Sequence, residues 1–168
     1  MKIYIAQTID GYIAGSDGSL DHLDAFQDSD FGYDEFIASV DGILMGRNTL
    51  EAFYDQHGWP YPEHLPAIIM THRILPHGMP EQVRTSESIE VAAQMLPNAY
   101  VDGGHVIAQC LARGLIREAR IFTLPILLGA GIPLFLEGAA TTQSWTLTGS
   151  KSHPCGTVEN HYNIPAKA

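Results

Sequence analysis

The sequence predicts a three-layer α/β domain, in which a mostly parallel central sheet is flanked by helices and closed by an antiparallel C-terminal hairpin. Short apolar runs alternate with stretches of helical periodicity up to residue 124, a pattern typical of parallel sheets with crossover helices. From residue 145 onward, two strand-like runs flank a Pro-Cys-Gly turn, which indicates an antiparallel pair. The 168 residues contain no linker or repeat, so we expect a single domain over 1–168.

Runs rich in β-branched and aromatic residues predict the strands. The first begins almost at the N-terminus. The second, Ile43-Leu44-Met45, is apolar throughout, as expected of a strand buried on both faces. The predicted strands cover residues 2–6, 43–45, 66–70, 83–84, 99–101, 120–124, 145–149 and 157–164.

Stretches with apolar residues at three- and four-residue steps predict the helices. Ser29 or Asp30 is the expected N-cap of the first helix, and Ser86 or Ser88 that of the third, which Pro97 ends. The predicted helices cover residues 30–40, 50–54, 86–96 and the stretch between Gly104 and Gly114.

The net charge and the cysteine content of the chain indicate which partners and which cellular compartment to expect. The formal net charge of −10 argues against nucleic acid or an anionic membrane as the main partner, although a small anionic ligand remains compatible with locally placed arginines. Cys110 lies on the apolar side of a predicted helix and is expected to be a buried free thiol. With no disulfide framework and no signal peptide, we expect a cytoplasmic protein. Histidine and cysteine spacing predicts no metal site.

Residues suited to phosphate binding follow two of the predicted strands. Gly46, Arg47 and Thr49 come after the second strand, and Thr71 and Arg73 come after the third. Carboxyl ends of parallel strands form the ligand crevice of such sheets. Each arginine alone is typical of an ordinary surface, but together we expect them to converge on one phosphate.

A glycine turn follows the strand at 99–101. Gly103 and Gly104 come between this strand and a helical stretch, a geometry that lets a phosphate approach the backbone at a helix start. A bare Gly-Gly pair more often makes only a tight connection. The arginines earlier in the chain make phosphate binding the better interpretation.

Five motifs, taken in order, resemble the dihydrofolate reductase-like superfamily, most closely the reductase domain of the bifunctional riboflavin-biosynthesis enzyme. The resemblance runs over nearly the whole chain. The motifs are A-x-x-x-D-G-x-I-A at residues 6–14, I-L-M-G-R-x-T at 43–49, T-H-R at 71–73, D-G-G at 102–104 and P-x-L-L-G-x-G-x-P-L-F at 125–135.

The resemblance implies the fold described above, NADPH as cofactor and a homodimer. The apolar run of the 126–135 loop makes that loop the expected contact of the homodimer. The resemblance also implies a cis peptide between Gly103 and Gly104. The implied cofactor residues are Ala6 and Ile13 at the nicotinamide carboxamide, Gly46, Arg47 and Thr49 at phosphates, Thr71 and Arg73 at the adenosine 2′-phosphate, and Gly103, Gly104, His105 and Val106 at the pyrophosphate.

The resemblance also implies an acid on the substrate side. In dihydrofolate reductases, a carboxylate early in the first helix binds the pterin and assists protonation, and counting back from the G-R-x-T motif places Asp30 there. A helix cap is the equal alternative for Asp30. Tyr4 stands where the riboflavin-pathway reductases carry a lysine, and His22 where many small homologues carry a tryptophan.

The resulting interpretation is an NADPH-dependent reductase that transfers hydride to a small pterin- or aminouracil-type heterocycle. It is most similar to a 5-amino-6-(5-phosphoribosylamino)uracil reductase of riboflavin biosynthesis. The alternatives are dihydrofolate reductase activity and a non-catalytic NADPH-binding or sensor protein.

Overall fold

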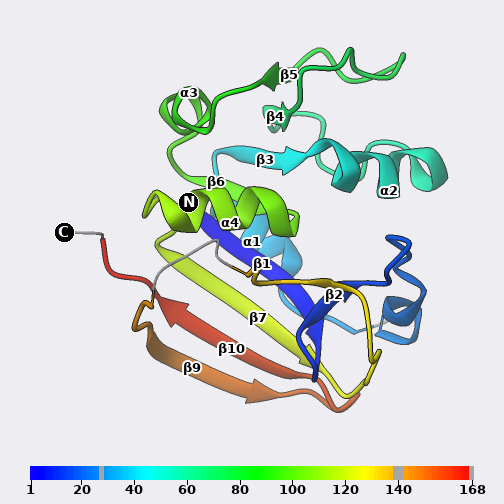
Figure 1. Cartoon of the computed structure of the whole chain (residues 1–168), viewed down its shortest axis with the longest axis vertical. Helices are drawn as coiled ribbons and strands as arrows, with labels where there is room; N and C mark the ends of the chain where they lie inside the picture. Colours follow the sequence, from blue (N-terminus) through cyan, green and yellow to red (C-terminus); the bar gives the residue numbers. More distant parts are fainter. Residues whose placement is uncertain (27–28, 138–141, 167–168) are drawn as a thin grey trace.

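A computed structural model describes residues 1–26, 29–137 and 142–166 of the chain. An eight-stranded sheet forms its middle layer, in the order β5-β4-β3-β6-β1-β7-β10-β9. All pairs from β5 to β7 are parallel, whereas β10 is antiparallel to both β7 and β9 (Figure 1). Its strands are β1 (Lys2–Thr8), β3 (Gly42–Gly46), β4 (Ala67–Met70), β5 (Val83–Ser86), β6 (Ala99–Asp102), β7 (Glu118–Leu124), β9 (Thr146–Ser152) and β10 (Val158–Asn163). The predicted fold class is confirmed.

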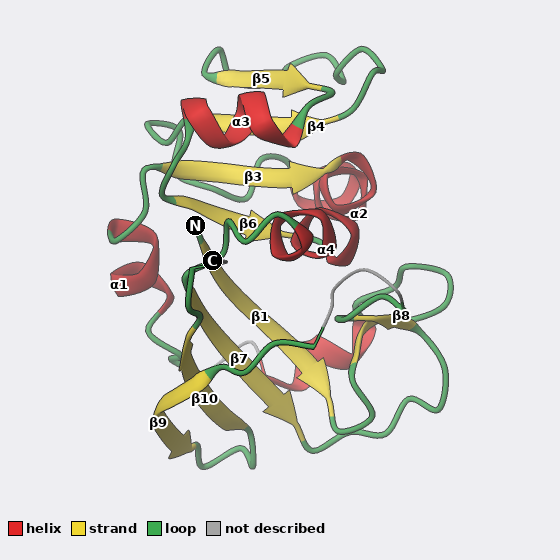
Figure 2. Ribbon diagram, turned by 60° about the vertical axis from the view of Figure 1, so that its left-hand side comes forward, coloured by secondary structure: helices red, strands yellow, loops and turns green. Residues whose placement is uncertain are grey.

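Helices cover both faces of this sheet, with α3 and α4 in front of the strands in Figure 2. Strand side chains alternate between two apolar cores. Leu44 packs in the core beneath α3 and α4, while its neighbours Ile43 and Met45 pack in the core with α1 and α2. The helices are the 3-10 helix η1 (Asp21–Phe26), α1 (Tyr33–Ala38), α2 (Arg47–His57), α3 (Ile89–Met95) and α4 (Gly104–Ala112).

Several strands extend beyond their predicted limits because backbone pairing continues past the apolar residues. β7 begins at Glu118 because Lys2 of β1 pairs with it, and β5 reaches Ser86 because Met70 of β4 pairs with it. Such polar residues at strand ends carry no hydropathy signal. The predicted C-terminal hairpin is confirmed.

The first helix starts later than predicted. α1 begins at Tyr33 with Gly32 as N-cap, at a φ of 71°, so neither Ser29 nor Asp30 caps it. The Asp30 carboxylate instead accepts a hydrogen bond from Gly32 N at 2.8 Å, one turn before the helix.

Two short strands were not predicted, β2 (Tyr12–Ala14) and, in the expected 126–135 loop, β8 (Ile132–Pro133); they form a small antiparallel ribbon. Asp10 joins the loops that carry them, because its carboxylate accepts hydrogen bonds from Gly129 N at 2.7 Å and Leu128 N at 3.3 Å. The hydrogen bonds from Thr8, Gly129 and Leu128 lower the pKa of Asp10.

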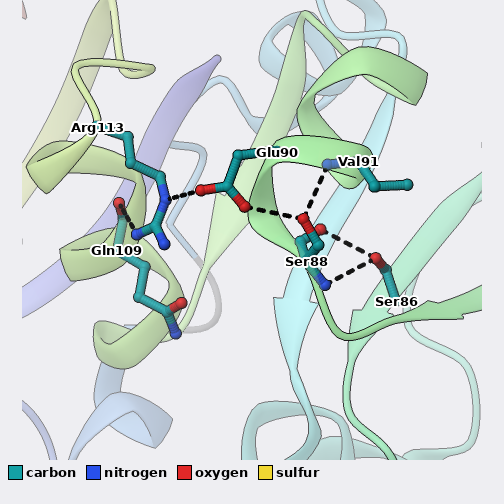
Figure 3. Close-up of polar contacts among 6 residues, drawn as sticks. All are labelled: Ser86, Ser88, Glu90, Val91, Gln109 and Arg113. Atoms are coloured by element: carbon teal, nitrogen blue, oxygen red, sulfur yellow. Dashed lines mark hydrogen bonds and ion pairs between the residues drawn. The ribbon is translucent and has the colours of Figure 1, made fainter.

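A polar network joins the start of α3 to the end of α4 on one face of the sheet (Figure 3). The Ser88 hydroxyl accepts from Val91 N at 3.2 Å, which confirms Ser88 as the cap of α3. Glu90, in the first turn of α3, pairs with Arg113 at the end of α4 across 2.5 Å.

The predicted free thiol is also confirmed, because Cys110 of α4 is buried and unpaired.

Within the described ranges, no helix is both long enough and apolar enough to cross a membrane.

Candidate functional site

Two helices begin side by side at the carboxyl edge of the sheet. β3 and β6 are parallel neighbours, with Met45 opposite Asp102. Each strand is followed at once by a helix: α2 begins at Arg47 and α4 at Gly104. Because helix starts carry unpaired N–H groups and the positive end of the helix dipole, this edge concentrates anion-binding donors.

The two helix starts touch at the glycine turn. Gly103 has a φ of 87°, and a Cβ atom placed on it would collide with Thr49 Oγ1. A Cβ on Gly46 would lie 3.4 Å from Val106 Cγ2. Only glycine fits at Gly103, both for its backbone conformation and for the space beside Thr49. Gly46, Thr49, Gly103 and Val106, all predicted site residues, are therefore together.

The β2–β8 ribbon closes the third side of this turn. A Cβ on the buried Gly104 would lie 3.1 Å from the Pro133 carbonyl and 3.4 Å from Ile13 Cδ1. Ile13 thus lies beside the glycine turn. The pairing of Tyr12 and Ala14 with β8, together with the Asp10 hydrogen bonds, joins the loops on both sides of Ile13.

The hydrogen bonds of the turn define which amides remain for a ligand. Gly103 N donates to Asp102 Oδ1 at 2.8 Å, and the N–H groups of Val106 and the next residue donate to Gly103 O at 3.0 Å. Within the described chain, the first N–H groups of α4, those of Gly104 and His105, have no such bond. They are the donors that this helix start offers to an anion. The described residues contain no cis peptide, so the expected cis bond between Gly103 and Gly104 is wrong.

Asp102 links the glycine turn to Tyr61 by hydrogen bonds. It is buried, and its Oδ2 accepts a hydrogen bond from the hydroxyl of Tyr61, also buried, at 3.0 Å. Burial raises the pKa of Asp102, against the opposing effect of hydrogen bonds from Tyr61 and Gly103. Sequence reasoning missed this role, because nothing in the residues around Tyr61 indicates that its hydroxyl reaches Asp102, 41 positions away.

The two predicted arginines do converge, on a carboxylate of the protein itself. Glu51 Oε1 lies 2.8 Å from Arg47 Nε, and Glu51 Oε2 lies 3.5 Å from Arg73 Nη2. Arg73 N donates to Thr71 Oγ1 at 3.1 Å, which fixes the turn after β4. Glu51 was not predicted, although its i,i+4 spacing from Arg47 is the usual signal for such a pair.

Arg73 and Thr71 border an open hollow of about 580 Å³ at the carboxyl ends of β4 and β5. It is lined by Thr71, His72, Arg73, Ile74, Leu75, Val83, Arg84, Thr85, Ser86 and Glu87.

The remaining predicted residues lie on the α1 face of the sheet. Ala6 is half-buried in β1 opposite Phe122 of β7. Tyr4, two residues before Ala6, donates its hydroxyl to Phe31 O at 3.1 Å. Asp30 precedes Phe31 and is exposed. In the described chain, no hydrogen bond joins Asp30 to the glycine turn.

A buried acid–base cluster borders the same face. Glu159 of β10 contacts His153 Nε2 at 2.8 Å and also binds His161 Nε2. Burial alone would raise the pKa of Glu159, but hydrogen bonds from His161 and His153 outweigh it and lower that pKa. The His153 ring lies edge-on against Phe31, with centroids 4.8 Å apart.

No group of three or more His, Cys, Asp or Glu side chains among the described residues is arranged to hold a metal ion. At the carboxyl edge, helix amides supply hydrogen-bond donors, and Arg47 and Arg73 supply positive charge. This fold and site define an α/β protein with a candidate anion-binding site where its parallel strands end.

Comparison with known proteins identifies the family. The model of the RibD C-terminal domain matches residues 2–158, so the chain belongs to that family. It is 30% identical over 149 residues to "Uncharacterized protein YwjB" of Bacillus subtilis (strain 168), covering 80% of this chain and 82% of YwjB. The family predicted from the motifs is confirmed.

Solved structures share the fold. The crystal structure named "Putative riboflavin biosynthesis protein", from Shewanella sp. PV-4, superposes with a TM-score of 0.84 at 31% identity and 98% coverage of both chains. A Thermotoga maritima deaminase and 5-amino-6-(5-phosphoribosylamino)uracil reductase gives a TM-score of 0.65 at 13% identity. That match covers 98% of this chain and 56% of the larger protein, and it shows the fold alone.

Proposed function

We propose that this protein is an NADPH-dependent reductase that transfers hydride to a small heterocyclic substrate. Membership of the RibD C-terminal domain family supports a riboflavin-pathway reductase-like activity. The leading substrate candidate is a 5-amino-6-(5-phosphoribosylamino)uracil or a related aminouracil, and a pterin is the alternative.

One observation carries this proposal: the contact between the starts of α2 and α4 at the Gly103 turn. A dinucleotide presents two linked anionic groups, a pyrophosphate and a 2′-phosphate. The N–H groups of Gly104 and His105 suit the first. Arg47 and Arg73, next to the open hollow, suit the second.

When bound, the nicotinamide supplies hydride; the residues of this chain bind and orient. The backbone at Ala6 and Ile13 would hold the carboxamide, with Ile13 beside the glycine turn. Thr49 packs against Gly103 and keeps the two helix starts in contact. Asp30 would hold a proton for the reduced substrate.

The residues expected to face the substrate, Asp30 and Tyr4, support a second candidate function, that of a non-catalytic NADPH-binding protein. Asp30 is exposed. The hydroxyl of Tyr4 is engaged by Phe31 and its ring packs against Tyr33, Phe36 and Phe122. Tyr4 therefore supplies no cation in place of the lysine of the riboflavin-pathway enzymes.

Turnover distinguishes the two candidates. The purified protein is mixed with NADPH and a panel of aminouracil ribosides and dihydropterins, and the absorbance of reduced nicotinamide is followed. Loss of absorbance with one substrate supports the reductase. NADPH binding with no loss across the panel supports the non-catalytic protein.

We further propose a cytoplasmic homodimer. The 126–135 loop, expected at the contact, exposes Leu127 and Phe135, and exposed apolar side chains that cluster mark association surfaces. Light scattering at several concentrations tests this, and a monomer at all concentrations would contradict it.

A further inference from the structure

Glu51 bridges the two arginines that the proposed function assigns to a phosphate. It lies on α2 one turn after Arg47, and its two carboxylate oxygens face different partners. Oε1 lies 2.8 Å from Arg47 Nε, and Oε2 lies 3.5 Å from Arg73 Nη2. One carboxylate thus occupies the space between two guanidinium groups that come from separate elements.

The carboxylate is ionised in this position. The hydrogen bond from Arg47 lowers the pKa of Glu51, and the charge of Arg73 adds to the effect. The cluster of two guanidinium groups and one carboxylate therefore carries a single net positive charge. Arg47 is also held from its other side, because its Nη1 donates to Ile74 O at 2.8 Å.

The contact between Glu51 and Arg73 contributes little to folding. The side chains of Glu51 and Arg73 are 37% and 54% exposed, and exposed ion pairs stabilise proteins weakly. Arg47 remains positioned by Ile74 even without Glu51. A carboxylate here therefore acts mainly on whatever approaches the arginines from the hollow beside Arg73.

We infer that Glu51 sets the discrimination between ligands with and without a phosphate at this position. A phosphate must displace the Glu51 carboxylate or share the arginines with it, and the two anions repel each other. A ligand with a free ribose hydroxyl meets no such repulsion, because a carboxylate accepts a hydrogen bond from a hydroxyl. Glu51 thus lowers the selectivity for NADPH over NADH. This inference rests on the proposed function.

The test compares Glu51→Gln with the wild type and with a matched control, Glu90→Gln. Glu90 pairs with Arg113 at 2.5 Å in a similarly exposed Glu–Arg pair away from the site (Figure 3). Dissociation constants for NADPH and NADH are measured by nicotinamide fluorescence, and those for adenosine 2′,5′-bisphosphate and AMP by calorimetry. Thermal melting checks that each variant is folded.

Glu51→Gln is expected to tighten NADPH and the bisphosphate about five- to tenfold, the scale of one screened charge pair. NADH and AMP should change less than about twofold, and Glu90→Gln should match the wild type for all four ligands. Unchanged or weaker NADPH binding in Glu51→Gln would overturn the inference while leaving the reductase proposal intact. If the wild type binds none of the four ligands, both fail.

Discussion

Asp102 provides a sharp test of how the glycine turn is held. In Asp102→Ala, the hydroxyl of Tyr61 loses its acceptor inside the protein and Gly103 N loses a bond of 2.8 Å. An unpaired buried donor costs about 1–3 kcal/mol and a second lost hydrogen bond about 1 kcal/mol. We therefore expect about 2–4 kcal/mol of destabilisation, and a melting temperature lower by roughly 5–12 °C.

Asp102→Asn is the matched variant, because it keeps the shape of the side chain and removes the charge. Its Oδ1 can still accept from Gly103 N, but its Nδ2 is a donor and cannot accept the hydrogen bond that the Tyr61 hydroxyl gives to Asp102. The free energy of unfolding should therefore fall by about 1–3 kcal/mol at neutral pH, less than in Asp102→Ala, which loses both hydrogen bonds.

The pH dependence of the free energy of unfolding separates the effect of the Asp102 charge from that of its hydrogen bonds. Burial raises the pKa of Asp102 in the folded protein, so the folded state binds the proton more tightly than the unfolded chain does. The contribution of Asp102 to stability is then complete below the unfolded pKa of about 3.9 and is lost as pH rises through the folded pKa. The stability of Asp102→Asn relative to the wild type should therefore increase from acid to neutral pH.

Urea unfolding of the wild type and both variants at pH 4 and pH 7 measures these differences. Equal stability of Asp102→Ala and Asp102→Asn at both pH values would refute the reasoning, because the hydrogen bonds to Tyr61 and Gly103 would then carry no weight.

Three further results are expected. Replacing Arg47 and Arg73 together by alanine should weaken NADPH about 10- to 100-fold, since charge-assisted hydrogen bonds are lost, and NADH much less; equal loss in titrations of both would remove the 2′-phosphate assignment. Asp30→Asn should reduce steady-state turnover and spare NADPH affinity, and unchanged turnover would leave Asp30 without a catalytic role. Glu159→Ala should destabilise the protein by about 1–3 kcal/mol at pH 7 in urea unfolding, because the buried His153 ring loses its hydrogen-bond partner. Because the pKa of Glu159 is lowered, the difference from the wild type should shrink as pH falls below about 4.3; a constant difference would contradict this.

Much of the fold was predictable because hydropathy and backbone pairing agree over most of the sheet. The apolar run at 43–45 and the glycine turn at 103–104 correctly marked β3 and the start of α4. The ribbon of β2 and β8 was missed, because its few residues pair across more than a hundred positions of sequence.

Of the candidate site, too, only some residues could be predicted from the sequence. The residues at strand ends could be found because parallel strands bring their carboxyl ends to one edge, and Thr49 and Gly103 do meet there. The contacts of Glu51 with Arg73 and of Tyr61 with Asp102 could not be assigned from sequence, since those partners come from other elements, whereas the i,i+4 spacing of Glu51 from Arg47 did carry a signal. Asp30 was predicted inside a helix, but the left-handed Gly32 delays the start of α1 and leaves the carboxylate exposed.

The central claim is that the edge formed by α2, α4 and the two arginines binds NADPH. Its most direct test is a titration of the wild-type protein with NADPH and, separately, with NADH, followed by nicotinamide fluorescence. We expect saturable binding of both, with NADPH bound more tightly because only it carries a phosphate for Arg47 and Arg73. Binding of neither would mean that the glycine turn and the arginines serve the fold alone, and the reductase proposal would fall.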